Sequence, residues 1–192
     1  MEQRMDHADL IQRILSGESR AFGELVQRYQ HMVYTVCMRV LRNAEDAEEA
    51  SQDAFVKAFR NLSGFTGGSK FSTWLYTIAY RSAISRARQR RTNTDPLDEL
   101  VHQPVAAAPR DGLHRTDVRH YLNQALEKLT PEESTILSLH YLDELSVEEI
   151  VTITGLSASN VKVRLFRSRK RLEAALNTEL NGEARSLLLN DA

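Results

Sequence analysis

Cysteine, proline and glycine are scarce in this chain of 192 residues, and each scarcity excludes a class of protein. The single cysteine, Cys37, rules out an internal disulfide and a cysteine-rich zinc site, and it favours a reducing compartment. The 8 glycines and 4 prolines are too few for a collagen or a low-complexity polymer. No apolar run has the length of a signal peptide or a membrane span. We therefore expect a cytoplasmic protein with no direct membrane insertion.

The first half of the chain carries the periodicity of helices. Proline is absent before Pro96, and apolar residues recur there at steps of three and four residues. The spacing predicts a short helix with an apolar stripe of Leu10, Ile11, Ile14 and Leu15, closed by Gly17. It predicts a second apolar helical stripe that runs toward Asn43. It also predicts a helix from Ala44 to about Arg60 and a further helix from Phe71.

The second half is predicted to be helical as well. Residues 130–133 combine a capping threonine, a proline at the first helical position and a glutamate that completes a capping box. Residues 146–149 repeat the box, and Ser157 is predicted to cap a last helix that runs to roughly Leu176. No strand-like alternation stands out, so we expect an all-α fold.

A change of composition separates the two halves. The stretch 92–115 holds three of the four prolines and no sustained periodicity, which is typical of a flexible interdomain linker. The sequence therefore predicts two small helical domains. Their expected bounds are 8–91 for the first domain, 92–115 for the linker, 116–176 for the second domain and 177–192 for a tail.

Charge is segregated along the chain although 25 bases nearly balance 26 acids. Residues 45–53 hold five acids and no base, residues 54–94 hold eight bases and no acid, and residues 150–172 hold six bases and no acid. Solvated helices usually mix their charges, because opposite charges three or four residues apart stabilise a helix. Two acid-free stretches therefore indicate two surfaces that bind nucleic acid, with ordinary basic helices as the alternative.

Residues 147–166 have the spacing of a helix-turn-helix. Gly155 supplies the left-handed turn between a short first helix and a second helix that begins at Ser157. Val161, Leu165 and Ser168 form a stripe with Leu172 that is expected to pack on the domain. The opposite face, which suits the major groove of DNA, carries Ser159, Lys162, Val163, Phe166, Arg167, Arg169 and Lys170, with Arg164 and Arg171 at its flanks. Packing of Phe166 on a neighbouring helix is the alternative.

The acid-free stretch 54–94 is also rich in aromatic residues. Aromatic rings stack on unpaired bases and arginines hold the backbone, although part of the set is expected to be core. The loop residues 67–70 lack the full spacing of a nucleotide-binding P-loop, so we exclude an NTPase. The aromatic and basic residues are Phe65, Phe71, Trp74, Tyr76, Tyr80, Arg86, Arg88, Arg90 and Arg91.

Three segments, taken in order, resemble those of bacterial sigma factors. Residues 46–60, from Asp46 to Arg60, resemble the segment that binds core RNA polymerase. Residues 71–79, Phe-Ser-Thr-Trp-Leu-Tyr-Thr-Ile-Ala, look like the promoter-melting segment, and residues 145–169 look like the region 4 helix-turn-helix. The resemblance covers about residues 8–176, and two domains with a short linker look like the extracytoplasmic-function (ECF) type.

The resemblance implies a role for each surface. Core-polymerase binding, through the coiled coil of the largest subunit, would fall to Glu49, Gln52, Asp53 and Phe55. Recognition of the −10 element would fall to Phe65, Lys70, Phe71, Trp74, Tyr80, Arg81 and Arg88. Recognition of the −35 element would fall to Ser159, Asn160, Lys162, Val163, Arg164, Phe166, Arg167 and Lys170. The family further implies promoter DNA and an anti-sigma factor as partners.

Two other functions remain open as alternatives. A stand-alone helix-turn-helix regulator would bind operators without polymerase, but it leaves the acidic helix without a role. An enzyme is not expected, because none of the six histidines has metal-ligand or triad-like spacing and Cys37 falls on an apolar stripe. We accordingly expect no metal, no cofactor and no small-molecule substrate.

Overall fold

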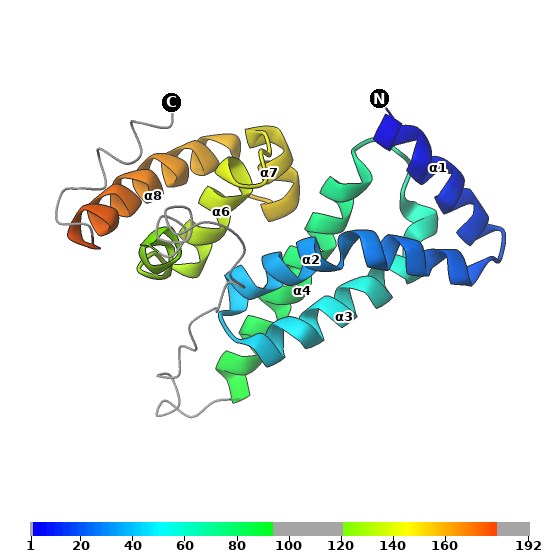
Figure 1. Cartoon of the computed structure of the whole chain (residues 1–192), viewed down its shortest axis with the longest axis horizontal. Coiled ribbons are helices and arrows are strands. Elements are labelled where there is room, and N and C mark those ends of the chain that lie inside the picture. The colour runs from blue at the N-terminus through cyan, green and yellow to red at the C-terminus, as the bar shows by residue number, and fades with distance from the viewer. Residues whose placement is uncertain (1, 94–120, 180–192) are drawn as a thin grey trace, which may run out of the picture. The chain divides into compact units, whose positions relative to one another are not determined.

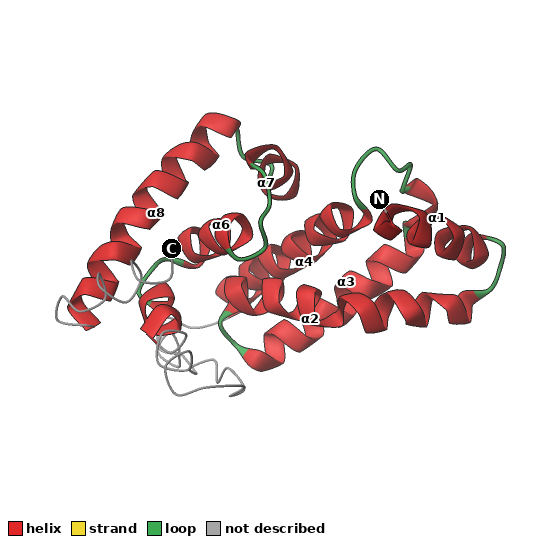
Figure 2. Ribbon diagram, turned by 45° about the horizontal axis from the view of Figure 1, so that its top comes forward, coloured by secondary structure: helices red, strands yellow, loops and turns green. Residues whose placement is uncertain are grey.

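The computed structural model describes residues 2–93 and 121–179, and every regular element within these ranges is a helix (Figure 1). Figure 2 shows only helices and connecting loops over the same residues. The predicted all-α class is confirmed. The chain divides into two compact units, which we describe separately. Most of the predicted linker 92–115 and of the tail 177–192 lies outside the described residues.

The first unit is a bundle in which α2, α3 and α4 pack pairwise against one another, while α1 contacts α2 (Figure 1). Its core includes large side chains from α2 and α4, among them Leu25, Val33, Val36 and Leu75, all buried. The elements of this unit are α1 (Glu2–Leu15), η1 (Ser19–Ala21), α2 (Phe22–Leu41), α3 (Ala44–Arg60), η2 (Leu62–Gly64) and α4 (Phe71–Asn93).

Local capping sets the boundaries of α2 and α3. Arg42 ends α2 in the left-handed region, with φ 51°, and its N–H donates to the carbonyl of Met38 at 2.8 Å. The Asn43 side chain then accepts from the N–H of Asp46 at 2.9 Å, which is an N-cap bond. The helix predicted over residues 44–60 is confirmed at both ends.

The inner face of α3 consists of small residues. Because no large side chain stands on this face, α2 and α4 can approach the α3 backbone closely. The larger side chains of α3 must point elsewhere, so the packing determines which residues α3 presents to solvent. The buried residues of α3 are Ala47, Ala50, Ser51, Ala54 and Ala58.

Leu15 departs from the apolar stripe predicted for α1. Leu10, Ile11 and Ile14 are buried as expected, but Leu15 is 53% exposed. It is the last residue of the helix, and the chain leaves α1 through Gly17 at φ 108°. Ile14, in the same last turn, is buried, so Leu15 lies on the solvent-facing side of that turn.

The second unit is built around the packing of α6 against α8. A helical segment at residues 121–127 precedes α6 (Pro131–Tyr141), α7 (Val147–Thr154) and α8 (Ala158–Glu179). Leu126, Leu129 and Leu137 form a buried cluster, against which Leu122 and Leu172 pack.

The predicted start and stop signals of this unit are confirmed. Thr130 Oγ1 accepts from the N–H of Glu133 at 3.3 Å, and the N–H of Thr130 donates to the Glu133 carboxylate at 3.2 Å. Ser146 and Glu149 form the same reciprocal pair at 3.2 and 3.0 Å. Gly155 adopts φ 73°, a left-handed conformation that favours glycine.

No helix in the described part of the chain is long and apolar enough to cross a membrane.

Enlarging the α3 inner face should destabilise the first unit. Ala54 is 0% exposed, so Ala54→Leu forces extra volume between α3 and the helices that pack on it. The substitution should lower the free energy of unfolding by about 1–3 kcal/mol. Denaturant unfolding followed by fluorescence checks this, because Trp74, the only tryptophan, reports on this unit. Val56→Leu adds one methylene at an exposed position of the same helix and should change stability by less than about 0.5 kcal/mol. Equal stability of the two variants would contradict the packing argument.

Candidate protein and nucleic-acid interfaces

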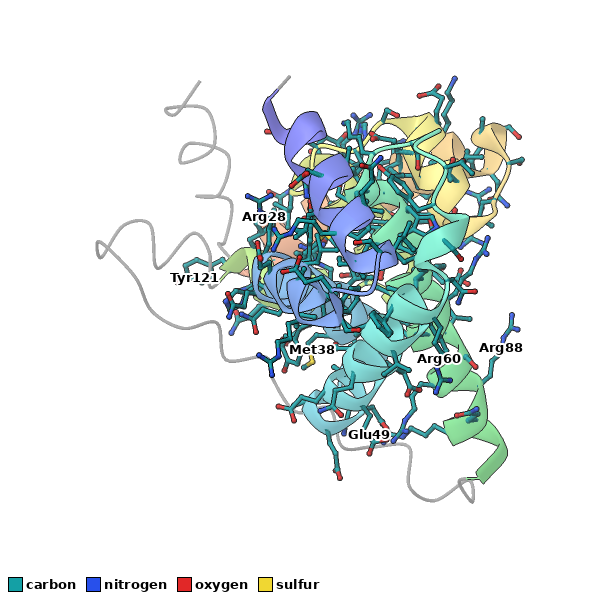
Figure 3. The ribbon with its side chains drawn as sticks, turned by 90° about the vertical axis from the view of Figure 1, so that its right-hand side faces the viewer. Arg28, Met38, Glu49, Arg60, Arg88 and Tyr121 are labelled. Atoms are coloured by element: carbon teal, nitrogen blue, oxygen red, sulfur yellow. The ribbon has the colours of Figure 1, made fainter. Side chains whose placement is uncertain are left out.

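The outer face of α3 forms a continuous exposed stripe. Gln52 and Asp53 lie three and four residues after Glu49, Val56 follows them by four and three, and Arg60 follows Val56 by four, so the five residues share one side of the helix. All five are exposed. The stripe changes along its length from acidic through apolar to basic. Figure 3 shows Glu49 and Arg60 toward opposite ends of it.

Phe55, the remaining residue predicted for this interface, lies beside the stripe. It is half-buried, and its ring meets Phe22 of α2 edge-on at 6.5 Å between centroids. Phe59 also packs on Phe22, at 5.0 Å, yet stays 43% exposed. The sequence reasoning missed Val56, which is 48% exposed, and Phe59. Val56 follows Glu49 by seven residues, which is two helical turns, and this spacing alone could have predicted that Val56 shares the exposed face.

Part of the acidic run on α3 is neutralised within the unit. Asp46 accepts from Arg86 Nε at 2.8 Å and from Arg90 Nη1 at 3.1 Å, and Glu49 forms an ion pair with Arg86. The hydrogen bonds to Asp46 and Glu49 raise the pKa of Arg86 above its ordinary value. Asp53, by contrast, forms no ion pair with any residue that the structure describes.

Phe71 stands at the centre of an aromatic cluster in the first unit. The ring is only 5% exposed, and four other rings surround it at centroid distances of 5.4 to 5.6 Å. One of them, His7 of α1, also hydrogen-bonds to the hydroxyl of Tyr29 at 2.6 Å. The four surrounding residues are His7, Tyr29, Phe65 and Trp74.

The residues predicted for the −10 element therefore fall into different environments. Phe71 and Tyr80 are buried, so both contribute to packing. Phe65 and Trp74, whose rings lie 5.5 Å apart, are half-buried and each offers part of a ring for stacking. Beside them runs an exposed loop that turns at Gly67, with φ 75°.

The basic members of that set are all exposed and lie far apart. Lys70 precedes α4, whereas Arg81 and Arg88 lie along it. At the rise of an α-helix, Arg88 lies roughly 25 Å from the start of α4. Figure 3 shows Arg88 projecting away from the bundle. The set suits an extended chain that follows the helix better than a single compact ligand.

The outer face of α8 is exposed as the sequence predicts. Val163 and Phe166 are 46% and 51% exposed, and Lys162 and Arg167 are exposed beside them. Lys170 Nζ stands over the Phe166 ring at 4.7 Å from its centroid, a cation–π contact that orders both side chains. The same face carries the exposed polar residues Ser159 and Asn160.

On the opposite side of α8, Val161 and Ser168 are buried at 0% exposure, Leu165 is buried at 9%, and Leu172 is half-buried. The predicted packing stripe is confirmed.

The bases at the flanks of α8 are engaged with α6. Arg164 forms an ion pair with Glu132 and donates to Asn160 at 3.0 Å. Arg171 donates to Glu133 at 2.8 Å. Burial alone would raise the pKa of Glu133, but hydrogen bonds from Thr130 and Arg171 outweigh it and hold this pKa below its ordinary value.

Cys37, the one cysteine of the chain, is buried in the core of the first unit. Burial raises the pKa of the Cys37 thiol to about 11, so the thiol stays protonated near neutral pH. Its sulfur lies 3.8 Å from the carbonyl oxygen of Ala79, within the core. No group of His, Cys, Asp or Glu within the described ranges is arranged to hold a metal ion.

Comparison with known proteins gives consistent matches over both units. Residues 25–92 match the family "Sigma-70 region 2", and residues 119–172 match "Sigma-70, region 4". "ECF RNA polymerase sigma factor SigW" of Bacillus subtilis is 33% identical over 177 residues, covering 86% of this chain and 94% of the relative. "ECF RNA polymerase sigma-E factor" of Escherichia coli K12 is 30% identical over 183 residues, covering 90% and 95%.

Solved structures share the fold. CnrH in complex with the cytosolic domain of CnrY matches with a TM-score of 0.63 and 24% identity, over 93% of this chain and 99% of that chain. RpoE in complex with the anti-sigma factor NepR, from Bartonella quintana, matches with a TM-score of 0.68 and 24% identity, over 81% and 96%.

Proposed function

The chain belongs to the extracytoplasmic-function (ECF) sigma factors of RNA polymerase, and we propose that it binds core polymerase and directs it to specific promoters. The observation that carries the proposal is the exposed stripe on α3. A face of this length with acidic, apolar and basic parts fits a protein partner, and the DNA-binding surfaces lie elsewhere on the chain. The role is one of binding, not catalysis, and it places the protein in the cytoplasm.

Docking on polymerase is assigned to the acidic half of the stripe. Gln52 and Asp53 are exposed at its middle, with Glu49 one turn before them and Phe55 at the side. We infer that their partner is the coiled coil of the largest subunit. An acidic face favours a basic partner, which both speeds association and selects against acidic surfaces.

Promoter recognition is assigned to two surfaces. The outer face of α8 enters the major groove at the −35 element, where Lys162 and Arg167 can read guanine and Phe166 can contact a thymine methyl group. Phe65 and Trp74 stack on nucleobases of the separated −10 strand. The exposed arginines along α4, Arg81 and Arg88, hold the phosphates of that strand.

Regulation and domain bounds complete the proposal. We infer that an anti-sigma factor holds the chain inactive, in line with the complex of RpoE with the anti-sigma factor NepR. The two functional domains would span 8–91 and 116–176, with the helix-turn-helix at about 147–166. The linker 92–115 would keep them at promoter spacing, with 177–192 as a tail.

A stand-alone helix-turn-helix regulator is the rival function. It explains the face of α8 equally well. It gives no role to the α3 stripe, and it predicts tight operator binding without polymerase.

Run-off transcription tests the proposal directly. Core polymerase mixed with this protein and a pool of promoters should give discrete start sites, because the protein supplies the promoter contacts that core polymerase lacks. Core polymerase alone is the control. If adding the protein gives no start-site selection, the proposed function is wrong.

Asp53→Arg should weaken association with core polymerase by about tenfold or more, because it places a positive charge against a basic partner. Co-purification with core polymerase measures the effect. Asp9→Arg makes the same charge change at an exposed position of α1 and serves as the matched control. Equal binding by both variants would count against docking through α3.

Arg167→Ala should cost about 1–3 kcal/mol in binding to promoters with an intact −35 element, while association with core polymerase is unchanged. The affinity difference between promoters with intact and scrambled −35 elements measures it. Arg171→Ala removes the same positive charge from α8, but the Arg171 side chain is bound by Glu133. This variant should therefore leave the affinity difference between the two kinds of promoter unchanged. A larger loss in Arg171→Ala would contradict the assignment of the outer face.

A further inference from the structure

The end of α6 places an exposed tyrosine beside α8. Tyr141 is the last residue of α6 and is 48% exposed, although tyrosine has a large apolar ring. Its hydroxyl oxygen accepts from Arg169 Nη1 at 3.3 Å, which joins the end of α6 to the fourth turn of α8. The sequence reasoning gave Tyr141 no binding role.

The Tyr141 ring packs against the ring of the neighbouring residue, His140. His140 meets it edge-on, with the two centroids 4.8 Å apart and an interplanar angle of 73°. His140 is itself fixed, because its Nδ1 donates to the carbonyl of Leu145 at 2.9 Å. The phenol therefore projects from an ordered support, which lowers the entropy lost when it binds a ligand.

Arg169 lies at the edge of the face assigned to DNA. It follows Lys162 by seven residues and Phe166 by three, so the three side chains lie along one side of α8. A helix in the major groove is bordered by the phosphates of both strands. Residues at the edge of its outer face are therefore placed to contact a phosphate.

The chemistry of the pair suits an anion. Arg169 donates to the Tyr141 oxygen, which leaves the phenolic hydrogen available for another acceptor and strengthens it as a donor. Arg169 keeps further N–H groups and its full positive charge. A phosphodiester oxygen can accept from both groups at once.

We propose that Tyr141 and Arg169 together bind a phosphate of the DNA backbone beside the groove that α8 reads, so that the end of α6 is a further DNA-contacting element. The inference rests on the proposed function, since it takes α8 as the helix that enters promoter DNA. It adds a contact that fixes the register of α8 and reads no base.

The test measures promoter binding by polymerase carrying this protein, over a range of salt concentrations. Tyr141→Phe keeps the ring and removes the donor, so affinity should fall about three- to tenfold. The loss should be the same for intact and scrambled −35 sequences, and the salt slope should not change, because no charge is lost. Arg169→Gln should weaken binding and lower the salt slope by about one.

Leu142→Ala is the matched control, because Leu142 follows Tyr141 in the chain and is similarly exposed, at 51%. It should bind like the wild type. Thermal unfolding by circular dichroism should give Tyr141→Phe the same midpoint as the wild type, which separates a DNA contact from a structural role.

Several results would overturn the inference. Wild-type affinity in Tyr141→Phe would do so, as would a loss confined to intact −35 sequences, which indicates base reading. A loss of core-polymerase binding would show that Tyr141 faces protein. In each of these cases the wild-type protein still binds promoters, so the proposed function stands. If the wild-type protein with polymerase forms no promoter complex, the proposed function fails and the inference fails with it.

Discussion

The small residues on the inner face of α3 are the constraint on which the first unit depends. Alanine and serine side chains let α2 and α4 pack close to the helix, and they leave no large α3 residue for the core. The large side chains of α3 therefore lie on its outer face or, like the half-buried Phe55, beside that face. The face assigned to polymerase is thus a direct consequence of how the bundle packs. It keeps its orientation as long as the buried face of α3 carries only small residues.

Charged residues at the candidate interfaces of both units also form ion pairs within their own unit. Asp46 and Glu49 engage Arg86 and Arg90 across α3 and α4, and the acids at the start of α6 engage two arginines of α8. The acids of these pairs differ in exposure: the side chains of Asp46 and Glu133 are only 14% and 13% exposed, whereas those of Glu49 and Glu132 are 52% and 57% exposed. Exposed ion pairs contribute only about 0–1 kcal/mol each, so a phosphate or a charged partner can exchange with the pairs of Glu49 and Glu132 at small cost. The charges immediately available to partners are fewer than the sequence suggests.

Local signals in the sequence were sufficient to predict the helices. Asn43, Thr130 and Ser146 cap helices through bonds to residues three positions away, and such short-range patterns are visible without a fold. The exposure of Phe166 followed from helical periodicity alone. The ion pair of Arg86 with Asp46 joins residues 40 positions apart, so it depends on how α3 and α4 meet and could not be predicted from spacing.

The two candidate DNA surfaces differ in how far binding can be separated from stability. On α8 the residues proposed to contact DNA, Lys162, Phe166 and Arg167, are exposed. Val161 and Ser168, which pack on the domain, are buried, so single substitutions can test binding and stability separately. At the aromatic cluster the side chains proposed to stack on bases also take part in the packing. Phe71 is buried among four rings that include Phe65 and Trp74, the residues with ring surface left for a base. A variant of Phe71 that lost −10 recognition would therefore show only that the cluster must be intact, whereas a change confined to the exposed edge of Trp74 would bear on stacking itself.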